Sequence, residues 1–267
     1  MKKQNNNARI SAYSTKQFIH RNRVILLCMA TVMLFALYLN TANNHFYHRL
    51  HTAGLPWPQN QISYTLGDVT QPSIKYVALG DSLTSGVGAQ SFDETYSYRT
   101  AQQILKPHQS IILTPLSTPG YKSIDLVNHY LDKAVEIQPD IVTILIGVND
   151  VHGLGPSQSE FKTNYETLIR RLSTETHARI YAIAIPFIGT DELIWTPYRQ
   201  YYSSRTKTLN MVIRKLSDKY SVGYIDLYSN TIDLTDKPST YYSRDDFHPS
   251  SEGYKIWSKI IADGINN

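Results

Sequence analysis

From Ile74 onward, short apolar runs alternate with longer amphipathic stretches, and this alternation limits the possible folds more than any other feature. The apolar runs are nearly continuous, which is typical of strands buried on both faces of a parallel sheet. The stretches between them fit helices, and Ser157 with Glu160 forms a capping-box pattern at the start of one. The apolar runs cover residues 74–80, 110–116, 140–148, 179–186 and 222–228. We predict an α/β fold, a three-layer α/β/α sandwich with a five-stranded parallel sheet, over residues 73–267.

An uncharged apolar segment, residues 24–39, precedes this body. As a helix of roughly 16 residues it spans ~24 Å, which approaches the ~30 Å hydrocarbon thickness of a bilayer. Six basic residues come before it, and the first acidic residue of the chain is Asp68. Because positive flanks stay inside, we predict a basic cytoplasmic tail at 1–23, a transmembrane signal anchor at 24–39 and an extracytoplasmic stalk or linker at 40–72. The basic residues are Lys2, Lys3, Arg9, Lys16, Arg21 and Arg23.

A cleaved signal peptide is the alternative to this anchor, and the basic flank orients both in the same way. The sequence after residue 39 offers no clear small-x-small cleavage site, which favours retention of the anchor. In either case we expect the body of the chain outside the cytoplasm. It is membrane-anchored if the segment is retained and secreted if the segment is cleaved.

The net charge of +4 comes from the N-terminal tail. Without its six basic residues, 20 basic residues face 22 acidic ones, so the rest of the chain is mildly acidic and a nucleic-acid partner is not expected. The one cysteine, Cys28, lies in the apolar segment and supplies neither a disulfide nor a metal site. His45, His48 and His51 allow metal binding, but a solvated stalk is the preferred interpretation.

Residues suited to acyl transfer follow the predicted strands. Ser82 follows the first strand, and a serine hydroxyl becomes a nucleophile when a base such as His248 takes its proton. The imidazole needs a carboxylate on its other nitrogen, and Asp245, three residues earlier, is placed for this role. Asp246 competes for it, but its position two residues before the histidine favours a surface or capping role. We therefore predict Ser82, His248 and Asp245 as the catalytic residues.

The tetrahedral intermediate of acyl transfer also needs hydrogen-bond donors for its oxyanion. Candidates are the backbone N–H groups of Ser82 and Gly120 and the side-chain amide of Asn149, which follow the first three strands. Glycine at position 120 would let the backbone approach the substrate closely.

These residues resemble the SGNH hydrolases, also called GDSL-like lipases and esterases. The resemblance runs from about Ile74 to the C-terminus and rests on four blocks in the family's order. One departure is visible: the second block often carries an asparagine and an extra glycine where this chain has Pro115 and Ser117. The resemblance implies the SGNH or flavodoxin-like fold and the roles given above for the nucleophile, base and oxyanion donors. The blocks are Gly80-Asp81-Ser82-Leu83, Gly120, Gly147-Val148-Asn149-Asp150 and Asp245-x-x-His248-Pro249.

The predicted function is hydrolysis of a carboxylic ester, either a lipid, a short acyl ester or an O-acetylated glycan, through an acyl-enzyme. Two alternatives stay open: an acyltransferase that uses the same residues on a sugar or lipid acceptor, and a binding protein that retains the fold without turnover. No metal or organic cofactor is implied. In particular, a dinucleotide site is not expected, because position 91 is serine and Gly86-Val87-Gly88 does not complete the fingerprint. Trp195 and His152 are candidates for substrate binding.

Overall fold

The computed structural model describes residues 2–153, 155–187, 189–234 and 238–267, with the side chains of residues 2–21 and of 238 and 239 left aside. The chain divides into two compact units, Met1–Arg49 and Leu50–Asn267. Each unit is described by itself. The side chains of the predicted basic tail, apart from those of Asn22 and Arg23, lie outside the described residues.

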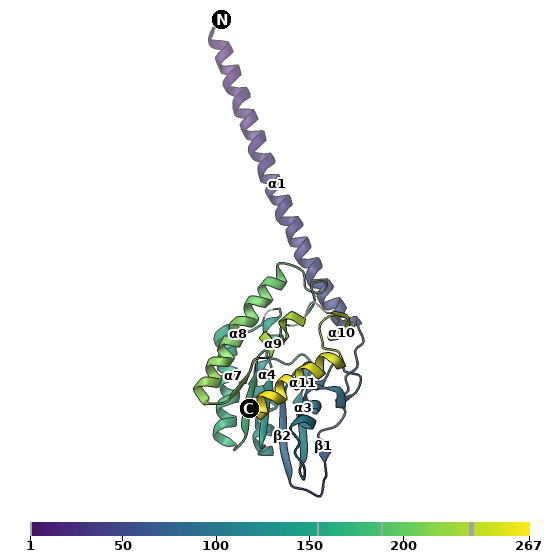
Figure 1. Cartoon of the computed structure of the whole chain (residues 1–267). Helices are drawn as coiled ribbons and strands as arrows, with labels where there is room; N and C mark the ends of the chain where they lie inside the picture. Colours follow the sequence, from purple (N-terminus) through teal and green to yellow (C-terminus); the bar gives the residue numbers. More distant parts are fainter. Residues whose placement is uncertain (1, 154, 188, 235–237) are drawn as a thin grey trace. The chain divides into compact units, whose positions relative to one another are not determined.

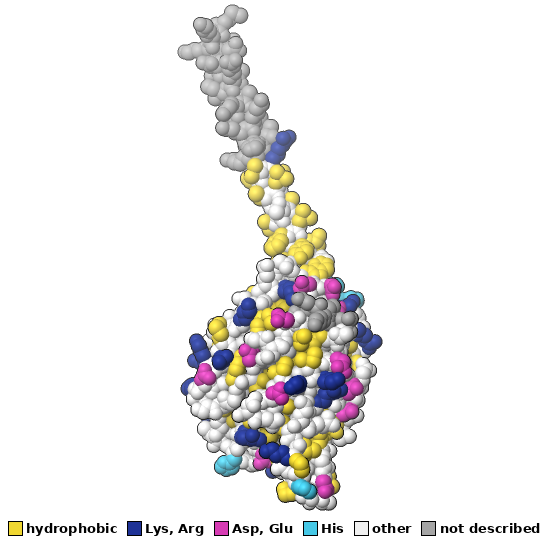
Figure 2. Space-filling view, viewed as in Figure 1, with side chains coloured by type: hydrophobic (Ala, Val, Ile, Leu, Met, Phe, Trp, Pro, Cys, Tyr) yellow, Lys and Arg dark blue, Asp and Glu magenta, His cyan; other side chains and the backbone are white. Residues whose placement is uncertain are grey.

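The first unit is formed by all but the last three residues of helix α1 (Lys2–Thr52), which extends beyond both ends of the predicted segment 24–39. Its portion Asn22–Thr52 is long and apolar enough to cross a membrane, a test that a signal sequence also passes. Large apolar side chains such as Leu27 and Val32 are exposed along it, and Figure 2 shows them around the described part of the helix. An exposed apolar helix of this kind is compatible with a membrane anchor.

The second unit is built on a six-stranded sheet with the order β1-β3-β2-β4-β5-β6. Strands β2 to β6 run parallel, as predicted, and the short strand β1 pairs antiparallel with β3 at the edge. The predicted linker, residues 40–72, did not include β1, whose four residues contain one buried side chain, Leu66. The bounds are β1 (Tyr64–Gly67), β2 (Ser73–Gly80), β3 (Ser110–Ser117), β4 (Ile141–Leu145), β5 (Arg179–Ile183) and β6 (Gly223–Ile225).

Two groups of helices flank the sheet, as the sandwich prediction requires (Figure 1). One group is α3 with α11, and the other is α4, α5, α7 and α8, which pack against one another in sequence. The predicted capping box is present at α7, where Ser157 accepts the N–H of Glu160 and the Glu160 carboxylate accepts the N–H of Ser157. The bounds are α3 (Tyr96–Ile104), α4 (Ser123–His129), α5 (Leu131–Ile137), α7 (Gln158–Glu175), α8 (Tyr198–Tyr220) and α11 (Ser251–Asn266).

The core lies on both faces of the central strands. All five residues of β4 are buried, as are Tyr76 to Gly80 of β2. Each fully buried aliphatic side chain of this kind contributes about 1.5–3 kcal/mol to stability. Trp257 anchors α11 in the core and donates its indole N–H to the hydroxyl of Tyr241. This rigid sheet fixes the strand ends from which the candidate site is built.

Short helical segments follow several strands and carry the polar residues of the site. Their bounds are α2 (Ser82–Ser85), η1 (Phe92–Glu94), α6 (Val148–Val151), α9 (Leu227–Thr231), η2 (Ile232–Leu234) and α10 (Pro238–Tyr241). Helices α2 and α6 begin within three residues of the ends of β2 and β4, which are neighbours in the sheet. Their first residues therefore meet at the carboxyl edge of the sheet, where parallel sheets bind ligands.

Candidate active site

Ser82 lies at the tight turn from β2 into α2. Asp81 caps this helix, because its carboxylate accepts the N–H of Leu83 at 3.0 Å. A Cβ added to Gly80 would lie 2.0 Å from Oγ1 of Thr84 and 2.6 Å from the carbonyl oxygen of Leu145, so the turn requires glycine. Ser82 itself is 5 % exposed. The turn thus holds the hydroxyl in a mostly enclosed position at the sheet edge.

His248 connects Ser82 to Asp245. Its Nε2 atom lies 2.9 Å from Oγ of Ser82, and its Nδ1 atom lies 2.6 Å from Oδ2 of Asp245. Because a carboxylate only accepts, Nδ1 carries the proton and Nε2 accepts the serine hydroxyl. Asp245 is fully buried, and its Oδ1 accepts the backbone N–H groups of Phe247 and His248 at 3.0 Å each. One carboxylate therefore orients both the imidazole ring and the backbone that carries it.

The turn that presents His248 runs from Ser243 to Pro249. Ser243 N–H donates to the carbonyl of His248 at 2.8 Å, and Asp246 has a left-handed φ of 59°. The backbone of Asp246 takes part in the turn, since its N–H donates to Ser243 and its carbonyl accepts the N–H of Thr190. Of the two aspartates weighed from the sequence, Asp245 is the one whose carboxylate contacts the imidazole.

The two other predicted oxyanion donors follow β3 and β4. Gly120 has φ 85° in the loop between β3 and α4, and Asn149 lies in α6. The side-chain amide of Asn149 donates to the carbonyl of Tyr121 at 2.9 Å and to Oδ2 of Asp81 at 3.3 Å. Asn149 thus joins the residue after Gly120 to the residue before Ser82, so the structure brings these three segments together.

Asp150 also supports the loop that contains Gly120, a role that its place beside Asn149 in the sequence did not indicate. It is fully buried, and its carboxylate accepts the N–H of Ser123 at 3.0 Å and the hydroxyl of Ser123 at 2.6 Å. Ser123 is the first residue of α4, directly after the loop that contains Gly120. Asn164 of α7 donates to the same hydroxyl at 3.3 Å. The far end of the loop is therefore fixed to two neighbouring helices.

Burial shifts the acidity of the carboxyl groups around Ser82. Burial raises the pKa of Asp81 to about 7; the hydrogen bond from Leu83 lowers it and the charge of nearby Asp150 raises it further. Burial also raises the pKa of Asp150, against the hydrogen bonds from Ser123. Near neutral pH, Asp81 is therefore close to the midpoint of its titration.

His152, a candidate for substrate binding, lies at the end of α6 beside the catalytic loop. Its ring centre is 4.4 Å from that of Tyr202 and 5.3 Å from that of Phe247. Its Nδ1 lies 2.6 Å from the carbonyl of Val148, and desolvation lowers its pKa to about 4. These contacts make His152 a packing partner of the residue before His248.

Trp195, the second candidate, lies in the connection between β5 and α8. The indole N–H donates to the carbonyl of Glu192 at 3.0 Å, within the same turn, and the side chain is half-buried. Ile188 in this connection lies outside the described residues.

Within residues 2–153, 155–187, 189–234 and 238–267, no three or more His, Cys, Asp or Glu side chains gather in a way that could hold a metal ion.

A serine, histidine and aspartate hydrogen-bonded in this order at the edge of an α/β sheet define the class of serine hydrolases. The model of the GDSL-like lipase/acylhydrolase family matches residues 78–256, which contain every residue of this candidate site. The chain belongs to this family and is a serine ester hydrolase, so the resemblance seen in the sequence is confirmed.

Two solved structures show the same fold. An acetylxylan esterase from Geobacillus stearothermophilus has a TM-score of 0.58 and 18% identity, over 74% of this chain and 96% of the other. A lipase/acylhydrolase from Enterococcus faecalis has a TM-score of 0.58 and 23% identity, over 72% of this chain and 95% of the other. At these identities the likeness concerns the fold alone. None of the curated proteins matches the chain.

Proposed function

We propose that this protein cleaves a carboxylic ester outside the cytoplasm through an acyl-enzyme on Ser82. The observation that carries the proposal is the hydrogen-bonded chain from Oγ of Ser82 through His248 to Asp245, with distances of 2.9 and 2.6 Å. A serine hydroxyl is a weak nucleophile by itself, and this chain supplies the base that activates it.

In the first half of the reaction, Oγ of Ser82 attacks the ester carbonyl while Nε2 of His248 takes the hydroxyl proton. The tetrahedral intermediate collapses when the bond to the leaving oxygen breaks and Nε2 returns the proton to that oxygen. In the second half, Nε2 takes a proton from water, the resulting hydroxide attacks the acyl carbon, and the bond to Oγ breaks as Oγ regains a proton. The Asp245 carboxylate stabilises the imidazolium formed in each half.

The oxyanion would accept hydrogen bonds from the N–H groups of Ser82 and Gly120 and from the amide of Asn149. A donor of this type contributes about 2.7–4 kcal/mol in a well-studied protease. The bond from Asn149 to Asp81 is long at 3.3 Å, whereas its bond to Tyr121 is 2.9 Å. The N–H that points toward Asp81 makes the longer bond, so it is the one available to an oxyanion, while the N–H bonded to Tyr121 keeps the amide in place.

The location and substrate class rest on different observations. The apolar segment 24–39 of helix α1 and the basic residues before this segment support an anchor with the catalytic unit outside the cytoplasm. Lipids, short acyl esters and O-acetylated glycans are the substrate classes to compare. The structural neighbour described as an acetylxylan esterase favours including acetylated glycans among them.

The test uses the full chain in a mild detergent. We expect a fluorophosphonate to label the wild type and to spare Ser82→Ala, which should also lose esterase activity across a series of acyl chain lengths and acetylated glycans. Ser204→Ala, which changes an exposed serine of α8, is the matched control and should behave as the wild type. A folded wild type that is not labelled, or an active Ser82→Ala, refutes the proposal. Product analysis with added acceptor alcohols separates hydrolysis from transfer, because a transferase forms new ester faster than free acid.

A further inference from the structure

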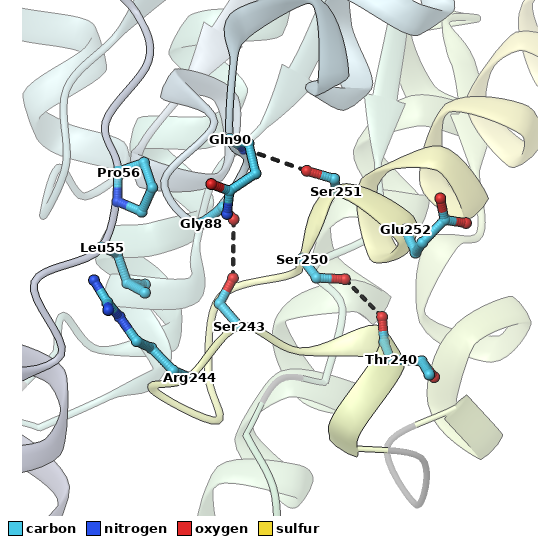
Figure 3. Close-up of a pocket in the computed structure, with 10 residues that line it drawn as sticks. All are labelled: Leu55, Pro56, Gly88, Gln90, Thr240, Ser243, Arg244, Ser250, Ser251 and Glu252. Atoms are coloured by element: carbon cyan, nitrogen blue, oxygen red, sulfur yellow. Dashed lines mark hydrogen bonds between the residues drawn. The ribbon is translucent and has the colours of Figure 1, made fainter.

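The segment before β1 contacts three parts of the candidate active site: the loop of His248, the loop after α2 and the end of β3. We call residues 54–60 the strap. The carbonyl of Gly54 accepts a hydrogen bond from the Arg244 guanidinium, next to Asp245, and the carbonyl of Pro56 accepts the N–H of Gly88 at 3.1 Å. Figure 3 shows Leu55 and Pro56 beside Gly88 and Arg244, around a cavity of about 560 Å³. The strap thus contacts the loop of His248 and the loop after α2.

Gln59 makes the third contact of the strap, at the end of β3. Its side-chain N–H donates to the carbonyl of Pro115 at 3.2 Å, and its side-chain oxygen accepts the hydroxyl of Ser117 at 2.7 Å. The pairing of β1 with β3 ends at Leu113, so the Pro115 carbonyl lies beyond the last strand partner on that side. Gln59 supplies by its side chain the hydrogen bonds that strand pairing no longer provides.

The hydrogen bonds of Gln59 continue to the helix that begins with Ser82. The hydroxyl of Ser85, in the last position of α2, donates to the hydroxyl of Ser117 at 3.0 Å. Ser85 is fully buried and Ser117 is 4 % exposed, so water competes little with these bonds. The strap, the end of β3 and the nucleophile's helix therefore share one hydrogen-bond chain.

The space around the Cα of Gly120 is open on the side where a side chain would lie. A Cβ built on Gly120 would meet no atom within 4 Å. The loop is instead held at its far end by Asn149, which binds the carbonyl of Tyr121, and near its start by Thr118, whose hydroxyl lies 2.7 Å from that of Tyr130. Ser117 is the residue at which the loop leaves β3, and Gln59 holds it there.

We propose that Gln59 is a positioning residue of the active site, which fixes the start of the Gly120 loop and so aims the Gly120 N–H at the oxyanion. The inference rests on the proposed function, because it assigns Gly120 as an oxyanion donor. The two residues that Gln59 binds, Pro115 and Ser117, are those at which the sequence departs from the family pattern. Gln59 thus stabilises a loop whose own sequence is unusual.

The experiment compares Gln59→Met with Gln61→Met in the full chain in detergent. Methionine keeps the volume of glutamine and removes both hydrogen bonds, and Gln61 is an exposed glutamine of the neighbouring segment. For Gln59→Met we expect kcat to fall by about tenfold, with KM within about twofold and the affinity for a boronic acid analogue of the tetrahedral intermediate reduced in step with kcat. Gln61→Met should match the wild type in all three measurements.

A double-mutant cycle with Ser117→Ala tests the route of the effect. Because either single variant already loses the hydrogen bond between Gln59 and Ser117, we expect the double variant to lose less kcat than the two single losses combined. Wild-type kcat in a folded Gln59→Met, or a fall in kcat with unchanged analogue affinity, overturns the inference. If Gln59→Met does not fold, Ser117→Ala tests the same hydrogen bond. A folded Ser117→Ala variant with the kcat of the wild type would then overturn the inference. An active Ser82→Ala would instead refute the proposed function, so the two failures are distinguishable.

Discussion

Oδ2 of Asp245 lies 2.6 Å from Nδ1 of His248, while Oδ1 of the same carboxylate accepts the backbone N–H groups of Phe247 and His248. Oδ2 therefore orients the imidazole ring, whereas Oδ1 stabilises the backbone turn. A substitution that changes only Oδ2 tests the first role without removing the second.

Asp245→Asn is that substitution. The amide oxygen can still accept the two backbone N–H groups, but the amide nitrogen would face Nδ1 and favour the tautomer that carries its proton on Nε2. We expect kcat to fall by about 10³–10⁴-fold at neutral pH with little loss of stability, as for the equivalent change in a serine protease. Steady-state kinetics with a short acyl ester and thermal unfolding check both parts.

Asp246→Asn is the matched control for this change. Asp246 has φ 59°, a conformation that asparagine adopts readily, and its backbone groups supply the hydrogen bonds of the turn. We expect this variant to keep wild-type kcat. If Asp246→Asn were the inactive variant and Asp245→Asn the active one, our assignment of the carboxylate would be wrong.

The strands β2 to β6 and the residues at their ends could be predicted because both follow from local patterns. The runs around Val77 and Ile144 are buried on both faces, as continuous apolar sequence indicates. The Asp245-x-x-His248 spacing predicts a contact across one turn, and the structure has that contact. Asn149 contacts Asp81, the residue before Ser82, because the strands before them are neighbours in the sheet.

The strap and β1 could not be predicted in the same way. Strand β1 has four residues and one buried side chain, which is too little for a periodic signal. Gln59 is far in sequence from Pro115 and Ser117, and a single polar side chain shows no preference for a partner that distant. Likewise, the roles of His152 and Asp150 depend on tertiary contacts with Phe247 and Ser123.

Gly120→Ala tests the proposed oxyanion loop. The added methyl group would meet no protein atom within 4 Å, but φ 85° is unfavourable for alanine and costs about 1–2 kcal/mol of stability. If the loop relaxes, the N–H moves away from the oxyanion, and a displacement near 1 Å can reduce the rate by about 10²-fold. We expect kcat/KM to fall by about that factor while the protein stays folded at 25 °C. An alanine variant with wild-type kcat/KM would contradict the expected displacement, because it would show that the N–H of residue 120 keeps its place in spite of the added methyl group.

Asp81 and His152 should affect the pH dependence of stability in opposite directions. The folded-state pKa of Asp81, about 7, lies above its ordinary value of 3.8, so its contribution to the free energy of unfolding decreases as pH rises between these values. The folded-state pKa of His152, about 4, lies below its ordinary 6.5, so its contribution increases with pH over that range. Each slope is at most about 1.4 kcal/mol per pH unit.

Urea unfolding between pH 4.5 and 6.5 measures both effects as differences from the wild type. We expect the slope of the unfolding free energy against pH to become more positive in Asp81→Asn and more negative in His152→Gln. The slopes of the double variant should lie near that of the wild type, because the two contributions oppose each other. Equal slopes in all four proteins would mean that neither group has a shifted pKa in the folded state.

The proposed membrane topology can be tested with cysteine labelling because Cys28 is the one cysteine of the sequence and lies in the apolar part of α1. In a Cys28→Ser background, Gln61→Cys places a thiol at an exposed position of the catalytic unit, and Ser14→Cys places one in the basic segment. We expect a membrane-impermeant maleimide to label Gln61→Cys on intact cells, and Ser14→Cys only after permeabilisation, because the basic flank stays inside. The label should remain with the membrane fraction at high pH if the helix is retained and appear in the medium if it is cleaved. Labelling of Ser14→Cys alone on intact cells would reverse the proposed orientation and place the esterase in the cytoplasm.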